Sequence, residues 1–152
     1  MKYLITALLF FVSSLAQAEN YPSNDSSCGG YPQAKVGTQE GTCLGIVLQA
    51  GDEVKWRKPR RITQVPNTKQ FIVTDMGGWT RGRGTVWLLD TASTPAKLTA
   101  LVTKLKLPHG LEIGPEGLFY VGETDRIFRF RLDQNKAVDI ETVVKDLPDF
   151  KK

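Results

Sequence analysis

The sequence predicts an all-β fold, a partial β-propeller that follows a signal peptide, and three observations lead to this prediction. The segment that starts at Pro59 and the segment that starts at Pro108 repeat the same order of turns and short apolar runs. The repeat spans about 40 to 50 residues, which is typical of one four-stranded propeller blade. The apolar runs are short and rich in β-branched and aromatic residues. Two blades are too few to close a ring, so we expect about two blades of a larger propeller.

Residues 1–18 are expected to be a signal peptide and to lie outside the fold. Lys2 supplies a positive start, residues 4–15 are mostly apolar, and Ala16-Gln17-Ala18 has the small-x-small pattern of a cleavage site. The apolar run is shorter than the roughly 20 residues that a spanning helix needs. We therefore expect cleavage after Ala18, export to the periplasm or the medium, and no membrane attachment of the mature chain.

Residues 19–50 are expected to form a disulfide-tied segment that ends in a first strand. Cys28 and Cys43 are the two cysteines of the chain, and an even count in an exported protein favours a disulfide. Closing a loop of about 15 residues removes roughly 3 kcal/mol of unfolded-state freedom. Residues 19–41 lack apolar periodicity and are rich in turn formers, which predicts a loop. The first strand is predicted at residues 44–48.

Residues 51–106 are predicted to be the first blade, with strands at 71–73 and 85–89. Leu98, Leu101, Val102 and Leu105 have helical spacing, but their counterpart in the second unit, residues 140–147, is β-branched. We therefore interpret residues 98–105 as an outer strand.

The glycine-rich segment 77–84 is predicted to be a flexible hairpin connection. A phosphate-binding loop is disfavoured because Gly84 opens a strand and not a helix. Trp79, Arg81 and Arg83 leave the segment a possible role as a surface for an anionic or sugar ligand.

Residues 107–152 are predicted to be the second blade, truncated at its end. A turn at residues 115–117 precedes a hairpin formed by 119–121 and 127–132. Phe128 and Phe130 alternate with Arg129 and Arg131, which predicts a strand with one buried and one wet face.

Arg60 and His109 are the candidate ligand-binding residues, because they occupy the same position in the two repeats. Both follow the proline that begins the innermost strand of a blade, and such strands line the central channel of a propeller. We expect both side chains to face a ligand on the axis. Lys58 and Arg61 are expected to point to solvent or to a neighbouring blade.

The charges exclude some partners. Residues 1–18 hold one lysine and no acid, so cleavage lowers the formal charge from +4 to about +3, too small an excess to imply a nucleic-acid partner. His109 is the one histidine, which rules out a pair of histidine metal ligands, and no metal site is assigned. A solvated surface is expected for the carboxylates Glu112, Glu116, Glu123 and Asp125.

The segment from Leu107 to Phe130, with its cadence Pro-His-Gly-Leu and Pro-Glu-Gly-Leu-Phe-Tyr-Val-Gly, resembles the second blade of the glucose/sorbosone dehydrogenase family. Pro59-Arg60 with residues 71–73 resembles the preceding blade. The resemblance implies a six-bladed periplasmic propeller that binds pyrroloquinoline quinone (PQQ), often with Ca²⁺, and oxidises sugars. The general-base histidine of the family follows an Asp-Leu-Pro segment. Asp146-Leu147-Pro148 matches this segment, and the histidine is expected beyond Lys152, so no catalytic residue is assigned.

We therefore interpret the chain as the N-terminal part of an exported PQQ-dependent sugar dehydrogenase, inactive as a short chain. Its substrate in the full-length protein is expected to be a small sugar. Two alternatives stay open: a non-catalytic secreted propeller that binds glycans or proteins, and a lactonase-like propeller hydrolase.

Overall fold

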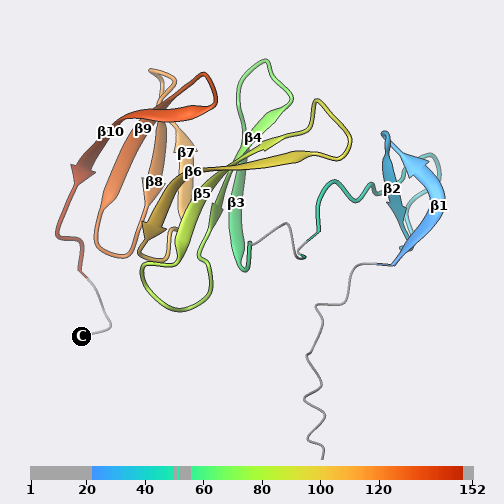
Figure 1. The fold of residues 1–152 in the computed structure, drawn as a ribbon, viewed down its shortest axis with the longest axis horizontal. Coiled ribbons are helices and arrows are strands. Elements are labelled where there is room, and N and C mark those ends of the chain that lie inside the picture. Colours follow the sequence, from blue (N-terminus) through green and yellow to red (C-terminus); the bar gives the residue numbers. More distant parts are fainter. Residues whose placement is uncertain (1–21, 50, 52–55, 149–152) are drawn as a thin grey trace, which may run out of the picture.

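The computed structural model describes residues 22–49, 51 and 56–148. These residues form ten strands and no helix, arranged as one two-stranded and two four-stranded antiparallel sheets (Figure 1). The predicted all-β class is confirmed. The predicted signal peptide lies outside the described residues, and no helix within the described part is long and apolar enough to cross a membrane.

The first four-stranded sheet contains the strands of the first repeat in the order of the chain. They are β3 (Pro59–Gln64), β4 (Gln70–Asp75), β5 (Gly84–Asp90) and β6 (Lys97–Leu105). Strand β6 pairs with β5 from Lys97 to Leu105, with two register irregularities. The interpretation of residues 98–105 as a strand is therefore confirmed, although the spacing of the leucines alone favours a helix.

The second four-stranded sheet repeats this order. Its strands are β7 (Gly110–Ile113), β8 (Phe119–Gly122), β9 (Ile127–Asp133) and β10 (Lys136–Val144). Gln134 and Asn135 join β9 to β10 with φ values of 43° and 62°. Positive φ at both central residues gives a two-residue turn whose twist suits a hairpin.

The first two strands of each sheet pair in the same register. Arg61 pairs with Thr74 in the first sheet, as Gly110 pairs with Gly122 in the second. Gln64 pairs with Phe71, as Ile113 pairs with Phe119. The repeat in the sequence is therefore a repeat of strand pairing, and Arg60 and His109 occupy equivalent points.

The main core lies between the two sheets. The second sheet contributes Phe119, Phe128 and Phe130, the last two fully buried, and the rings of Phe119 and Phe130 stack with centroids 5.4 Å apart. The first sheet contributes apolar side chains of β4, β5 and β6 to the same cluster. Because side chains alternate along a strand, Arg129 lies on the opposite face of β9, as predicted.

The N-terminal segment differs from its prediction. Strands β1 (Ser23–Cys28) and β2 (Tyr31–Ala34) form a hairpin within the predicted loop. Gly29 and Gly30 adopt φ values of 61° and 86°, which fits a tight hairpin turn. The predicted strand at 44–48 is reduced to one bridge between Gln33 and Gly45.

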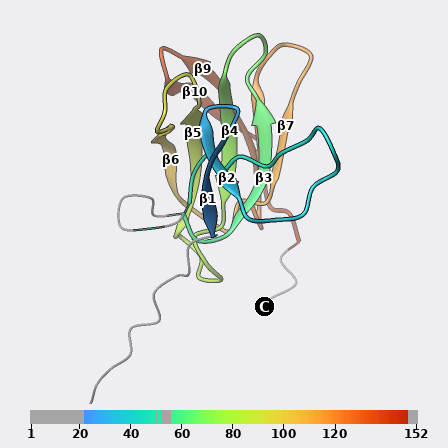
Figure 2. The same cartoon turned by 90° about the vertical axis from the view of Figure 1, so that its right-hand side faces the viewer.

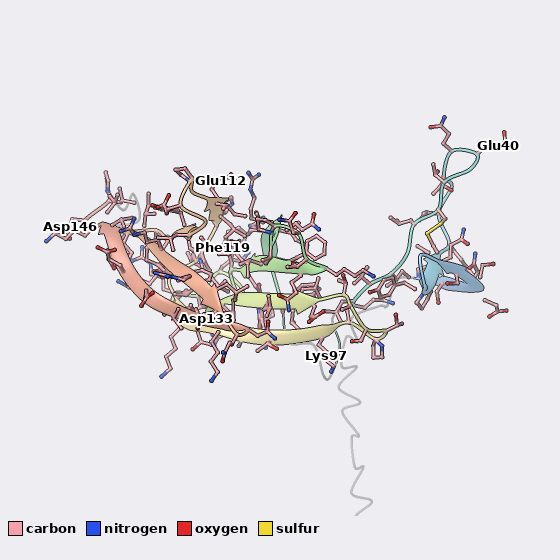
Figure 3. All side chains as sticks on the ribbon, turned by 90° about the horizontal axis from the view of Figure 1, so that it is seen from above. Glu40, Lys97, Glu112, Phe119, Asp133 and Asp146 are labelled. Atoms are coloured by element: carbon pink, nitrogen blue, oxygen red, sulfur yellow. A yellow bond between two sulfur atoms is a disulfide. The ribbon has the colours of Figure 1, made fainter. Side chains whose placement is uncertain are left out.

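The predicted disulfide is confirmed. Cys28 and Cys43 are bonded, with their Cα atoms 5.8 Å apart (Figure 3). The bond ties the hairpin to the segment that leads into the first sheet. Seen from the side in Figure 2, this segment lies in front of the first sheet. Val47, Leu48 and Trp56 pack against Val73 and Leu89, on the face turned away from the second sheet.

The far face of the second sheet is polar. The Tyr120 hydroxyl donates a hydrogen bond to Glu116, and Arg129 donates to Tyr120 (3.1 Å) and to Glu141 (2.9 Å). The hydrogen bond from Tyr120 contributes most to holding the pKa of Glu116 below its ordinary value, and the backbone N–H and Arg129 contribute less. Such a network stabilises a sheet face that is in contact with water.

Tyr120→Phe is expected to raise the pKa of Glu116, because it removes the hydrogen bond that contributes most to the lowering. A lowered pKa in the folded state stabilises the fold above the ordinary pKa of glutamate, about 4.3. This contribution disappears as the pH falls through the folded-state pKa. Carboxyl NMR titration measures the pKa, and Tyr31→Phe is the control, because the Tyr31 hydroxyl donates to the Thr91 carbonyl elsewhere. An unchanged Glu116 pKa in Tyr120→Phe contradicts the assignment.

Candidate ligand-binding site

One end of the two sheets brings together the segments on which the candidate residues lie. The antiparallel pairing places the starts of β3, β5, β7 and β9 at this end, beside the ends of β4, β6 and β8. Strands β3 and β7, the first of each sheet, are neighbours (Figure 2). Three connections therefore converge here: residues 76–83, 106–109 and 123–126.

Asp75 fixes the chain that enters β3. Its side chain is buried, and its carboxylate accepts hydrogen bonds from the backbone N–H groups of Lys58 (2.7 Å), Arg57 (3.0 Å) and Gly77 (2.9 Å). Hydrogen bonds to an ionised acceptor are stronger than those between neutral groups. One carboxylate thus positions both the basic segment before Arg60 and the start of the glycine-rich connection.

Glu123 has the same place in the second sheet. The backbone N–H of Lys106 donates to its carboxylate, which also forms an ion pair with Arg126. The side chain is buried, so the expected solvated surface is wrong for Glu123. Asp125 is partly exposed, and the hydrogen bond from the Lys106 ammonium lowers its pKa.

The glycine-rich connection between β4 and β5 is a hairpin loop, as predicted, and it is closely held at its base. A Cβ atom on Gly77 would lie 1.9 Å from the Arg83 carbonyl oxygen, and one on Gly84 would lie 2.1 Å from the Pro108 ring. The Gly82 N–H donates to the Leu105 carbonyl (3.0 Å). These approaches require glycine at 77 and 84 and attach the loop to the connection before β7.

Trp79 projects from this loop with 65% of its surface exposed. The Lys58 Nζ atom lies 4.9 Å from a Trp79 ring centroid, and the Arg60 Cζ atom lies 5.5 Å from it. Both distances are within the range of cation–π attraction. The Arg60 Nε–H also donates to the Met76 sulfur (2.8 Å). Arg60 is therefore oriented by contacts on two sides.

A hollow of about 280 Å³ adjoins Arg60 on the first strand of the first sheet. Trp56, Ile62 and Val73 are its apolar lining residues, and Arg60 and Arg61 also line it. The remaining lining residue is Pro59. An apolar surface beside guanidinium groups suits a planar or ring-shaped ligand that carries carboxylates.

The predicted residues have different positions in this arrangement. Arg60 lines the hollow, whereas His109 is exposed next to β7, where its backbone N–H donates to the Gly122 carbonyl (2.9 Å). Arg61 forms an ion pair with Glu112 of the neighbouring sheet (3.6 Å), as expected. Lys58 was expected to point away, and this is wrong, because it shares the ring of Trp79 with Arg60. Residues two apart on an extended chain lie on the same face. The spacing of Lys58 and Arg60 in the sequence therefore already indicates that their side chains share one side.

The described residues contain no group of three or more His, Cys, Asp or Glu side chains that could hold a metal ion. Comparison of the chain with protein-family models, curated proteins and solved structures finds no match.

Proposed function

We propose that this chain is the N-terminal part of an exported PQQ-dependent sugar dehydrogenase and that the hollow beside Arg60 contributes to the quinone site. Two four-stranded sheets with one register, joined from the last strand of one to the first strand of the next, support the interpretation as consecutive blades of a six-bladed propeller. The observation that carries the ligand assignment is the apolar hollow with arginines beside it.

The residues of the hollow fit a flat tricarboxylate. Arg60 supplies a planar guanidinium group that matches a carboxylate, and Trp56 with Ile62 supplies apolar surface for a ring. PQQ, when bound, supplies a two-electron acceptor for sugar oxidation. The residues of this chain bind and orient the quinone. No step of proton transfer is assigned to them, and the described residues supply no ligand set for Ca²⁺.

Arg60→Ala is expected to weaken PQQ binding by roughly 1.5 to 3 kcal/mol, because it removes a hydrogen bond between two charged groups. This corresponds to a Kd about 10 to 150 times higher. Calorimetric titration of the purified chain with PQQ measures the change. Arg60→Lys keeps the charge without the planar fork and should show an intermediate loss.

Arg131→Ala is the matched control. Arg131 lies on β9, is exposed, and forms its ion pair with Asp139 of β10, within the second sheet. It is expected to leave PQQ affinity unchanged. Equal affinity of Arg60→Ala and the parent chain, with unaltered circular dichroism, contradicts the quinone assignment.

The alternative of a secreted propeller that binds glycans is favoured by one observation, the exposed Trp79 with its two cations. A lactonase-like hydrolase has no specific observation in its favour among the described residues.

A further inference from the structure

Trp79 is the most exposed large apolar side chain among the described residues, and several contacts hold the loop and the cations around it. Its exposed fraction is 65%, against 58% for Ile62 and 52% for Leu44 and Ile140. An exposed indole without a partner gains nothing from hydrophobic burial. Here Lys58 and Arg60 lie over the rings, so the indole and two cations form one surface, the Trp79 surface.

The Trp79 surface is pre-arranged by its supports. The Asp75 carboxylate holds the backbone of Lys58 at one side and that of Gly77 at the other. The base of the loop is closed by the approach of Gly77 to Arg83 and by the Gly82 hydrogen bond to Leu105. A rigid surface loses less conformational entropy when it binds a ligand.

The charge of the Trp79 surface is not neutralised within the part of the chain that the structure describes. No described carboxylate lies within ion-pair distance of Lys58 or Arg60. Asp75, which accepts the backbone N–H of Lys58, is buried, and its oxygens accept backbone N–H groups. One ammonium group, that of Lys58, and one guanidinium group, that of Arg60, therefore remain for an anion that also contacts the indole.

We propose that the Trp79 surface, which shares Arg60 with the quinone site, binds oligosaccharides that contain uronic acids. A uronate ring offers an apolar C–H face that stacks on an indole, and a carboxylate at its edge for a cation. A neutral sugar leaves both cations unused. A nucleic-acid strand is less well matched, since strand-binding proteins stack successive bases on several aromatic side chains, whereas this surface has one.

The test is calorimetric titration of the purified chain with a galacturonic acid trimer, with a neutral glucose trimer as the reference ligand. The acidic trimer is expected to bind at least about tenfold more tightly, with affinity that falls as salt rises. Trp79→Ala is expected to weaken this binding by at least about tenfold, the loss of one stacking contact, and Lys58→Met by a smaller factor. Lys136→Met, an exposed lysine on β10, is the matched control and should have no effect.

Ile62→Trp separates this inference from the quinone proposal. Ile62 lines the hollow and is not part of the Trp79 surface, so a larger side chain there should prevent PQQ binding and leave the acidic trimer unaffected. Equal affinity for the two trimers, or acidic-trimer binding that Trp79→Ala leaves unchanged, overturns the inference. Tighter binding of a single-stranded oligonucleotide, lost in the same variant, also overturns it and makes this a nucleic-acid surface.

Discussion

Phe130→Ala is expected to lower the free energy of unfolding by about 3 to 5 kcal/mol, the range for removing a buried aromatic ring and leaving a cavity. The Phe130 ring is fully buried between the two sheets, stacks on Phe119 and lies 6.4 Å from the Phe128 ring centroid. Its neighbours come from both sheets and cannot easily move into the space. Urea denaturation followed by circular dichroism measures the change.

Ile140→Ala is the matched control for this prediction, because Ile140 lies on β10 of the same sheet but is 52% exposed. Its effect should stay within about 0.5 kcal/mol, as for most surface substitutions. Similar losses in both variants would show that the sheets do not pack through the phenylalanine cluster.

Asp75→Ala is expected to cost about 3 to 5 kcal/mol, because it leaves donors without a partner where one carboxylate now accepts three N–H groups. Asp75→Asn keeps one acceptor oxygen and should lose less. Asp133→Ala removes an exposed aspartate at the end of β9 and serves as the control. Thermal and urea unfolding measure the loss. A cost below about 1 kcal/mol, that of a single ordinary hydrogen bond, contradicts the role of Asp75.

Asp75→Ala should also change the ligand-binding end of the molecule. The same carboxylate positions Lys58 and Gly77, so the variant is expected to weaken binding at the Trp79 surface even where it remains folded. Phe130 lies in the core between the sheets, so Phe130→Ala should leave that binding intact in the folded fraction. The two variants thus separate stability from site geometry.

The strands of both repeats could be predicted because each has an apolar face or a counterpart in the other repeat. Residues 98–105 are an example. The spacing of Leu98, Leu101 and Leu105 favours a helix, but these residues form a strand because they pair with β5. A helix or strand preference of a short apolar run is easily overridden by its neighbours in the sheet.

The hairpin β1–β2 could not be predicted in the same way. Its sequence is polar, and its pairing depends on the turn at Gly29 and Gly30 and on the disulfide of Cys28. The burial of Glu123 was missed for another reason. Its partners are the backbone N–H of Lys106 and the side chain of Arg126. A hydrogen bond to a backbone N–H cannot be recognised from residue types.

The position of Arg60 at the start of an innermost strand was predictable from the repeat, whereas its contact with Trp79 was not. The two residues are joined by a loop whose path depends on Gly77, Gly82 and the Pro108 ring. Loop paths of this kind follow from the packing of several segments, and no periodicity encodes them.

The order of the strands also has a consequence for how fast the chain folds. Every strand from β3 to β10 pairs with the strand before or after it in the chain within its sheet, so each pairing closes a short loop. The entropy lost on closing a loop grows with its length, and chains with local pairings fold faster than those with distant ones. We expect each sheet to form by successive hairpins, and the docking of the two sheets through their phenylalanines to be the slower event. Stopped-flow refolding of Phe130→Ala tests this order: the early gain of strand signal should be preserved while the final step slows.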